Sequence, residues 1–356
     1  MFKMEARIAA LEKWGRFMAQ SYTGTPDPEL AKIHEHFDQP WQQALREAEL
    51  YNPWFTQDHL RHALETWGAT LTRPQLASWV AQYPALQKAE QNPQTVAIIM
   101  AGNVPLVGMH DLLATLVSPH HALIKPSSDD ERLWPVLLQV LVALEPQFAP
   151  EIRLAEGQIR KFDAVLATGS NNSARYFHYY FGKYPHIIRR NRSSVALLDG
   201  QESPEELKAL GEDVFRYFGL GCRNVSKVYL PEGFDWDRLF GAFYHFQAVK
   251  DHNKYSNNYD YNRAIYLMED IPFKENGFFI LREHSPLHAP VGVLHVEHYQ
   301  AREAVLQELA QKRAEWQCLV SREALSLPTV KPGQTQQPGL MDYADEEDTL
   351  QFMCTL

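Results

Sequence analysis

Hydrophobic residues in the first ninety positions recur every three or four residues, which is the spacing of amphipathic helices. The first series consists of Ile8, Leu11, Trp14, Phe17 and Met18. Similar series at 40–51, 57–67 and 73–83 predict three further helices. We therefore expect a helical segment over residues 1–90.

From Thr95 onward, short apolar runs alternate with helical patterns. Five runs are typical of buried strands and lie at 96–100, 122–125, 152–155, 164–167 and 194–198. Helical patterns lie between several of them, at 106–116, 129–144 and 174–181. Asp129 or Asp130 is a candidate N-cap for the second of these helices. This alternation predicts βαβ units and a parallel sheet.

Polar turns follow three of the predicted strands, at Gly102–Asn103, Lys125–Ser128 and Gly169–Ser170. Ligands of parallel sheets bind beyond the carboxyl ends of the strands. These turns are therefore predicted to face a ligand. The chain has no G-x-G-x-x-G motif, so this fingerprint does not support an ordinary dinucleotide-binding domain.

Composition and charge narrow the class of protein. The length of 356 residues favours two domains, and the net charge of −10 argues against a nucleic-acid partner, which needs a basic surface. No apolar run is long enough to predict a membrane span. The three cysteines, Cys222, Cys318 and Cys354, are far apart. They favour free thiols in a reducing cytoplasm over a disulfide framework or a metal site.

Cys222 is the best candidate nucleophile in the chain. It follows Gly219 and Gly221 and precedes a predicted strand at 227–231. Glycines let the backbone approach a ligand closely, so a cysteine on this turn can present its sulfur to a substrate carbonyl. The alternative is a buried structural thiol, because free cysteine is among the most buried residue types.

Two aromatic segments have less specific interpretations. Residues 176–181 are aromatic on every side, and we expect them to pack in a core. His252, Tyr255, Tyr259 and Tyr261 would line a substrate channel or lie on a surface helix.

Four short motifs occur in a fixed order: Asn103-Val-Pro105, Ile124-Lys-Pro-Ser127, Thr168-Gly-Ser170 and Gly219-x-x-Cys222. Their order and rough spacing resemble the aldehyde dehydrogenase superfamily. The Ala-Gly-Asn-Val-Pro-Leu and Lys-Pro-Ser-Ser forms, with the acidic segment 342–348, resemble its acyl-CoA reductase branch.

The resemblance implies an α/β fold of the aldehyde dehydrogenase type. The helical N-terminal segment would precede an NAD(P)-binding domain with a parallel sheet at 91–201. An α/β catalytic domain with the nucleophilic cysteine would follow at 202–330. The tail at 331–356 would supply a strand for association into a homo-oligomer.

The resemblance also implies roles for single residues. Cys222 would attack an acyl thioester, with its thiolate favoured by a cation such as Arg223. Asn103 would stabilise the oxyanion together with the Cys222 backbone N–H. Taken alone, Asn103 is more typical of a turn.

The cofactor implied by the resemblance is a nicotinamide dinucleotide. Lys125 would contact the adenosine ribose, Gly169 and Ser170 would face the pyrophosphate, and Glu283 would hold the nicotinamide ribose. NAD-preferring relatives usually carry a glutamate where this chain has Ser128. The missing carboxylate, with Ser127 alongside, favours NADPH over NADH because a carboxylate would repel a 2′-phosphate.

One departure from the superfamily pattern bears on the reaction. Where hydrolytic members carry a water-activating glutamate, residues 187–193 contain no carboxylate, so water would attack an acyl-enzyme slowly. The resemblance thus implies reduction of an acyl-CoA or acyl-carrier thioester to an aldehyde. Alternatives are an acyl-phosphate reductase and a non-catalytic binding protein on the same fold. Arg189, Arg190 and Arg192 would meet coenzyme A phosphates or form a solvated basic edge.

Overall fold

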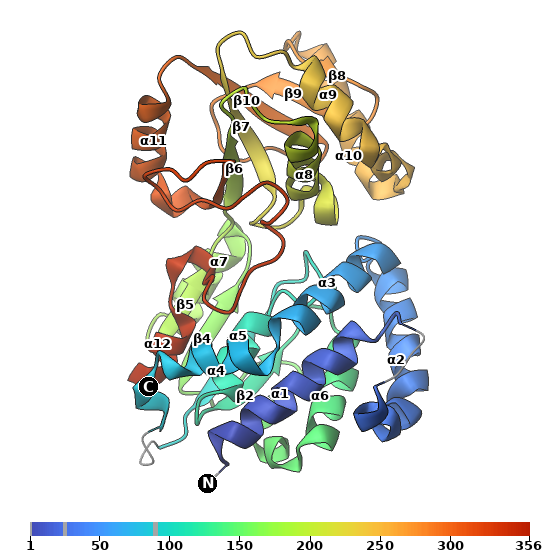
Figure 1. Ribbon diagram of the computed structural model, residues 1–356. Coiled ribbons are helices and arrows are strands. Elements are labelled where there is room, and N and C mark those ends of the chain that lie inside the picture. Colours follow the sequence, from blue (N-terminus) through green and yellow to red (C-terminus); the bar gives the residue numbers. More distant parts are fainter. Residues whose placement is uncertain (1, 24–26, 88–91) are drawn as a thin grey trace. The chain divides into compact units, whose positions relative to one another are not determined.

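The computed structural model describes residues 2–23, 27–87 and 92–356. The predicted domain boundary between residues 90 and 91 lies outside the described residues. The chain divides into two compact units (Figure 1). The first comprises Met1–Arg190 together with Gly339–Leu356, and the second comprises Asn191–Pro338.

The N-terminal helices follow the apolar periodicity of the sequence. They are α1 (Met4–Ala19), α2 (Ala31–Tyr51), α3 (Gln57–Thr70) and α4 (Arg73–Ala81). Helix α2 begins nine residues before its predicted start and contains Pro40. The pattern underestimated this helix because, of its buried residues, only Phe37 precedes Pro40.

A five-stranded parallel sheet, sheet A, forms the centre of the first unit, in the order β3-β2-β1-β4-β5. Its strands are β1 (Thr95–Ile99), β2 (His121–Lys125), β3 (Ile152–Leu154), β4 (Ala164–Thr168) and β5 (His186–Arg189). The helices that connect them are α5 (Met109–Leu116), α6 (Leu133–Leu144) and α7 (Asn171–Phe181). The parallel sheet is confirmed, and β5 is a strand that the sequence did not predict.

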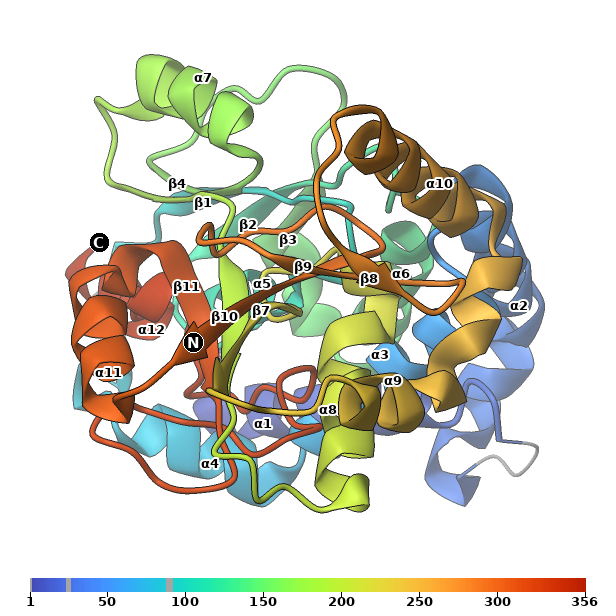
Figure 2. The ribbon, with the colours of Figure 1, turned by 90° about the horizontal axis from the view of Figure 1, so that it is seen from above.

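Successive residues of β1 point to opposite faces of sheet A, as the pleat requires. Val96 and Ile98 enter the large core that contains the buried residues of α5 and α6. Ala97 faces the other way, where Phe177 and Phe181 of α7 pack against it. Figure 2 shows α7 and α5 on opposite sides of β1 and β4.

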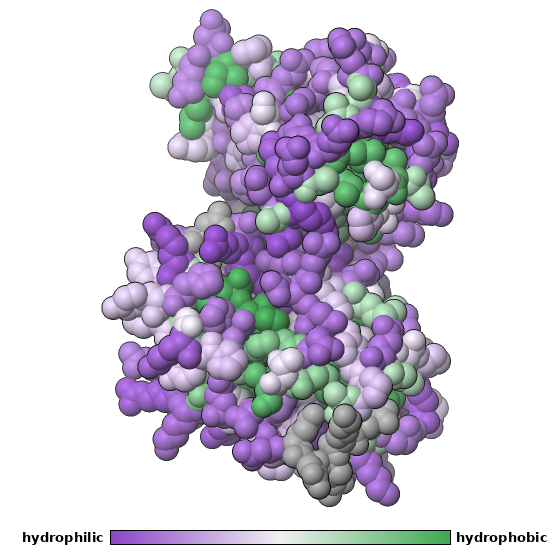
Figure 3. All heavy atoms as spheres, turned by 90° about the vertical axis from the view of Figure 1, so that its left-hand side faces the viewer, coloured by the Kyte–Doolittle hydropathy of each residue, from purple (hydrophilic) through white to green (hydrophobic). Residues whose placement is uncertain are grey.

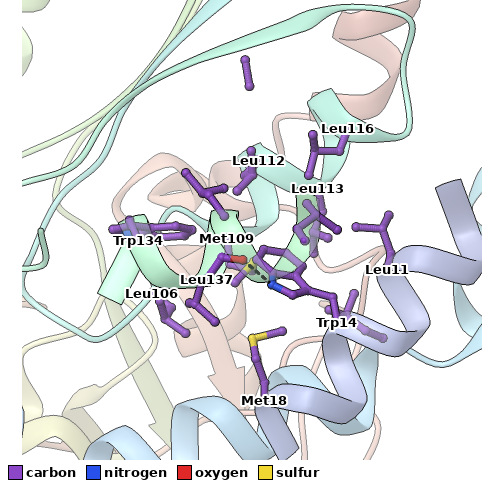
Figure 4. Close-up of a cluster of buried hydrophobic side chains, with 14 of the residues drawn as sticks. Leu11, Trp14, Met18, Leu106, Met109, Leu112, Leu113, Leu116, Trp134 and Leu137 are labelled. Carbon is purple, nitrogen blue, oxygen red and sulfur yellow. Dashed lines mark hydrogen bonds between the residues drawn. The ribbon is translucent and has the colours of Figure 1, made fainter. Parts of the chain in front are cut away.

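The N-terminal helices share this large core. Leu11, Trp14 and Met18 of α1 point towards side chains from α5 and α6 (Figure 4). The indole N–H of Trp14 donates to the carbonyl oxygen of Leu137 over 2.8 Å, which satisfies the one polar atom of a fully buried side chain. The helical segment is thus an integral part of the first unit.

The C-terminal segment also packs on the first unit. Leu350 and Met353 of α12 (Thr349–Thr355) are fully buried in the same core, and Trp79 donates to the Tyr343 hydroxyl over 2.7 Å. In Figure 1, α12 is the red helix beside the elements of this unit. The segment forms a helix here, where the sequence suggested a strand.

Sheet B forms the centre of the second unit, in the order β11-β6-β7-β10-β9-β8. Its strands are β6 (Ser193–Leu197), β7 (Val225–Pro231), β8 (Lys274–Glu275), β9 (Ile280–Glu283), β10 (Val293–Tyr299) and β11 (Trp316–Val320). All pairs are parallel except β8 with β9. The helices of this unit are α8 (Pro204–Phe215), α9 (Asp237–Phe243), α10 (Asn253–Met268) and α11 (Arg302–Gln311).

Hydrophilic residues cover most of the face that Figure 3 shows, and hydrophobic residues gather there in separate patches. Within the described residues, no helix is long and apolar enough to cross a membrane. Contrary to expectation, the aromatic segment of α7 is not wholly packed, since Tyr176, Tyr179 and Tyr180 are exposed. An 11-residue helix on one face of a sheet has room to bury only one stripe.

Candidate active site

Predicted site residues from three loops lie at the carboxyl edge of sheet A. Exposed Asn103 follows β1, half-buried Lys125 ends β2, and Gly169 follows β4. Because β1 pairs with both β2 and β4, these loops are neighbours along one edge. The strand order reverses between β1 and β4, which is the usual place for a ligand crevice in a parallel sheet.

The loops after β1 and β2 are in direct contact. A Cβ atom on Gly102 would lie 2.6 Å from the Ser127 hydroxyl oxygen and 2.8 Å from the Cβ of Asp129, so only glycine fits. Asn52, just after α2, donates through Nδ2 to the carbonyl oxygens of Gly102 and Asp129, each over 3.3 Å. Sequence reasoning missed Asn52, because no local pattern links it to loops that lie fifty residues or more away.

Asp130 is the buried anchor of the β1 loop. Its Oδ2 accepts from the backbone N–H of Leu106 over 3.0 Å and from the indole N–H of Trp134 over 3.2 Å, while Oδ1 is buried without a hydrogen-bond partner. Burial raises the pKa of Asp130 to about 8. Neither Asp129 nor Asp130 caps α6, which begins without a side-chain cap, because Asp130 is used for this tertiary contact.

Ser170 begins α7. Its hydroxyl accepts from the Ser173 N–H over 3.1 Å, so it is an N-cap. A Cβ on Gly169 would lie 2.8 Å from Cβ of Ser173 and 2.9 Å from Phe177, which explains the glycine at this strand–helix junction. Glu283, by contrast, belongs to β9 of the second unit, where its side chain is 68% exposed and lies 3.7 Å from His298 Nε2.

Cys222 lies in the second unit, between a 3-10 turn at Arg216–Gly219 and β7. It forms no disulfide and is half-buried, so it is neither sealed in the core nor fully exposed. Tyr217, Phe218 and Gly219 have φ values of 54°, 56° and 77°. Left-handed backbone at a non-glycine residue costs about 1–3 kcal/mol and occurs mostly at functional sites.

Asn224 holds this strained loop in place. Its Nδ2 donates to the carbonyl oxygens of Arg216 over 2.6 Å and Asp213 over 3.2 Å, and its Oδ1 accepts from the Gly221 N–H over 2.9 Å. One side chain therefore ties the end of α8 to the residue before Cys222. Asn224 follows the cysteine motif closely, but no local pattern indicates its role.

Arg223 is directed towards the other thiol of this unit. Its Nη1 lies 3.4 Å from Cys318 Sγ and donates to the carbonyl oxygen of Thr335 over 3.5 Å. The loop around Thr335 is held in turn by buried Asp213, which accepts from the Thr335 N–H and hydroxyl over 3.0 and 2.8 Å. Burial raises the pKa of Asp213 to about 6.

The arginines at 189–192 have different environments. Arg189 is buried and ion-paired to Asp111 at 2.6 Å, and it donates to Thr349 over 2.7 Å. Arg192 points to the carbonyl oxygen of Trp316 at 3.4 Å, and Arg190 is exposed. Arg189 therefore holds elements of the first unit together and is not available for the predicted contact with coenzyme A phosphates.

An apolar cavity lies beside the cysteine loop within the second unit. Its walls come from the end of α8 and the following turn, from the start of β7, from α10 and from the segment before β10. Lining residues include Phe218, Tyr255, Phe279, Ala289 and Val293. The Phe218 ring also stacks on His252, with ring centroids 4.3 Å apart. Tyr255, one of the predicted channel residues, does line this cavity.

Among the described residues, no group of three or more histidine, cysteine, aspartate or glutamate side chains is arranged to hold a metal ion. The structure groups Asn103, Lys125, Ser127, Ser128, Gly169 and Ser170 on loops of the first unit. It places Cys222 and Glu283 in the second.

Solved structures with a similar fold are aldehyde dehydrogenases and related enzymes. Aldehyde dehydrogenase 21 from Physcomitrella patens, in complex with the reaction product succinate, has a TM-score of 0.61 at 13% identity, covering 90% of this chain and 74% of its own. A Mycobacterium tuberculosis aldehyde dehydrogenase complexed with NAD+ has a TM-score of 0.56 at 12% identity, with coverages of 89% and 76%. An E. coli NADP dependent enzyme scores 0.57 at 12% identity, with the same coverages.

These likenesses establish the aldehyde dehydrogenase-like fold. The chain belongs to the acyl-CoA reductase (LuxC) family, whose model matches residues 10–234. No curated protein gives a significant match. Family and fold together support an oxidoreductase that acts on aldehyde or acyl groups.

Proposed function

We propose that this protein reduces an acyl thioester to an aldehyde with NADPH, through a covalent acyl-enzyme on Cys222. The observation that carries the proposal is the cysteine loop. A half-buried cysteine that forms no disulfide follows three consecutive residues with positive φ, and Asn224 holds the loop. Strained backbone that is held in place by its surroundings is characteristic of functional sites.

The chemistry begins with attack of the Cys222 sulfur on the thioester carbonyl. The leaving thiol, from coenzyme A or an acyl carrier, departs and the acyl group stays on sulfur. Asn103 and the Cys222 backbone N–H would stabilise the tetrahedral oxyanion, and each such donor is worth about 2.7–4 kcal/mol of barrier. The nicotinamide cofactor, when bound, supplies the hydride, and cleavage of the carbon–sulfur bond then releases the aldehyde.

The residues present fit a nicotinamide dinucleotide. Gly102 lets the loop after β1 pack against Ser127, and both loops lie at the switch point of sheet A, where ligands of such sheets bind. The amino end of α7, which follows Gly169 and Ser170, suits a pyrophosphate. Lys125 with Ser127 and Ser128 suits a 2′-phosphate, so we propose NADPH, with Glu283 as the residue for the second ribose.

The absence of a carboxylate from residues 187–193 supports thioester reduction over oxidation to an acid. A general base contributes about 10²–10⁴-fold to water attack. Without one, the acyl-enzyme persists long enough to be reduced. The acyl chain itself would lie in the apolar cavity beside Phe218. A reducing compartment such as the cytoplasm would keep the thiol available.

The nucleophile is tested by Cys222→Ala. Wild-type protein incubated with octanoyl-CoA alone should gain the mass of one octanoyl group, and Cys222→Ala should gain none. With octanoyl-CoA and NADPH, absorbance at 340 nm should fall for the wild type and stay constant for the variant, because no sulfur is present to form the acyl-enzyme.

Cys354→Ala is the matched control, since Cys354 is also half-buried and forms no disulfide but lies on α12 of the first unit. It should keep both the adduct and turnover. Equal NADPH consumption by wild type and Cys222→Ala would refute the proposal. Turnover of acyl phosphate but not of acyl-CoA would show that the protein is an acyl-phosphate reductase. If neither substrate formed an adduct, the non-catalytic binding protein would be the better interpretation.

A further inference from the structure

The amino edge of sheet B collects polar side chains around the cysteine loop. Because β6, β7 and β10 are parallel neighbours, their first residues lie side by side, about 4.8 Å from strand to strand. Cys222 lies three residues before β7, and His288 lies five residues before β10. Both segments therefore arrive at the same edge.

Two consecutive serines at the start of β6 bind these two segments. The Ser194 hydroxyl donates to the carbonyl oxygen of Cys222 over 3.1 Å. The Ser193 hydroxyl lies 3.0 Å from Nδ1 of His288. The Cα atoms of these two serines are about 3.8 Å apart, and the register between β6 and β7 shifts beside Ser194, so both segments are held at the start of β6.

The segment that carries His288 is fixed to β7 as well. Ser226 donates through its hydroxyl to the carbonyl oxygen of Leu287 over 2.7 Å. The fully buried Lys227 ammonium donates to the carbonyl oxygens of His284 and Ser285 over 2.5 and 3.0 Å. Backbone just before the imidazole is thus held against the strand that begins just after the cysteine loop.

His288 remains accessible although its backbone is fixed. Its side chain is exposed, and desolvation of the ring, with no charged group contributing, lowers its pKa below the ordinary value. The nearby cations point to other partners, Arg192 to the carbonyl oxygen of Trp316 and Lys227 to Glu297. His284 and His295, on the neighbouring strand and loop, also have lowered pKa values. The imidazole is therefore neutral near pH 7 and can accept a proton.

We propose that His288 is the proton carrier of the acylation step, an inference that rests on the proposed function. Nε2 of His288 takes the proton from the Cys222 thiol as the sulfur–carbon bond forms. When the carbon–sulfur bond of the substrate breaks, the imidazolium returns that proton to the departing thiolate. The products are the acyl-enzyme and a free thiol, so atoms and charge balance with no other reactant.

Ser193 is the positioning residue in this arrangement. With Nδ1–H donated to the buried hydroxyl of Ser193, the lone pair of the imidazole stays on Nε2, the atom that transfers the proton. A hydrogen bond at one ring nitrogen generally fixes the tautomer and orientation of a catalytic histidine. The chain has no carboxylate at 187–193 that could activate water. His288 would provide the base that acylation needs without promoting hydrolysis.

The test measures the acylation step alone. Octanoyl-CoA is mixed with protein without NADPH, and the mass of the Cys222 adduct is followed by rapid quench from pH 5 to 9. His288→Asn should slow acylation by about 10²-fold or more, within the usual range for a general acid–base residue. The wild-type rate should stay high through neutral pH and fall only when His288 becomes protonated on the acid side, whereas the variant rate should rise with pH as the thiol itself ionises.

His284→Asn is the matched control, because the contact of His284 with Lys227 uses its backbone carbonyl. It should leave the acylation rate and its pH profile unchanged. Ser193→Ala should shift the pH profile and Ser193→Thr, which keeps the hydroxyl, should restore it. Circular dichroism and thermal unfolding establish that each variant is folded, and His288→Gln provides a second substitution if the first is not.

The outcomes separate the two proposals. A wild-type adduct with an unchanged rate and pH profile in a folded His288 variant would overturn the role of His288 and leave the acyl-enzyme intact. Absence of any adduct in the wild type would remove both. A uniformly slower His288 variant with the wild-type pH profile would also overturn proton transfer and indicate a packing role.

Discussion

Two buried polar side chains, Asp130 and Asn224, hold the backbone at the ends of the strands that carry the candidate chemistry. Asp130 binds the N–H of Leu106, which has a φ of 56°, three residues after Asn103. Asn224 binds Arg216 and Gly221 on either side of the positive-φ residues. In each case one side chain forms hydrogen bonds with backbone groups of a strained turn, which cannot pair as they would in a helix or sheet.

Asp130 makes stability depend on pH. Its pKa is raised from 3.8 to about 8 in the folded state, so its contribution is fully present below about pH 4 and is lost as the pH rises through about 8. Asp130→Asn keeps the shape of the neutral acid and cannot ionise. Relative to wild type, the variant should gain free energy of unfolding between pH 6 and pH 9, by at most about 1.4 kcal/mol per pH unit.

Urea denaturation across this pH range measures the difference. Asp251→Asn is the control, since Asp251 is exposed and lies in the second unit, and this change should leave the pH slope unchanged. If Asp130→Asn and wild type lost stability in parallel between pH 6 and pH 9, the raised pKa would be wrong.

At the scale of elements, the turn before β7 and the segment before β10 form opposite walls of the apolar cavity. They come together because β7 and β10 are parallel partners, with Lys227 opposite His295. The sequence spacing between Phe218 and Ala289 gave no indication of this contact. One sheet edge and two helices line this cavity, so it could not be predicted without knowing the order of the strands.

Filling this cavity should change the preferred acyl length. Ala289 is buried and lines it, so Ala289→Leu would exclude part of a long chain. Each methylene left in water costs about 0.8 kcal/mol, or about fourfold in kcat/KM. The ratio of kcat/KM for dodecanoyl-CoA to that for butanoyl-CoA should therefore fall by about tenfold or more.

The control for Ala289→Leu is an alanine-to-leucine change at a position that does not line the cavity. Ala304→Leu, at an exposed position of α11, should preserve the ratio. An Ala289→Leu protein with the wild-type ratio would place the acyl chain elsewhere.

At the scale of the whole molecule, the chain passes from the first unit to the second after Arg190 and returns after Pro338. Arg189, next to the first crossing, binds Asp111 of α5 and Thr349 of α12. The returning segment thereby joins the core of α1, α5 and α6. We infer that the last eighteen residues, Gly339–Leu356, stabilise the first unit.

Leu350→Ala tests this assignment. Leu350 is fully buried, and loss of a buried leucine costs about 2–5 kcal/mol. Native-state hydrogen exchange should show weakened protection for amides of sheet A and α5. Amides of β7 and β10 should lose less.

Leu267→Ala, at an exposed position of α10, is the control and should leave both units unchanged. Greater loss of protection in sheet B than in sheet A after Leu350→Ala would contradict the assignment.

Local patterns in the sequence determined the N-terminal helices, four of the five strands of sheet A and the turns that follow three of them. Helix and strand periodicity depend on neighbours in the chain, and such patterns can be recognised without a structure. The motif order likewise indicated the superfamily, which the family match confirms. The roles of Cys222, Asn103 and the cofactor residues remain predictions from that resemblance.

Tertiary structure alone decided which distant segments meet. Asn52 reaches Gly102, Ser193 reaches His288 and Asp130 reaches Leu106, and none of these pairs has a local signature. Tertiary contacts also decided the place of residues 194–198, which were predicted in the cofactor-binding sheet but lie in sheet B. They likewise decided that the C-terminal helix packs on the first unit. Partners of this kind are fixed by strand order and core packing, which depend on contacts between residues far apart in the chain.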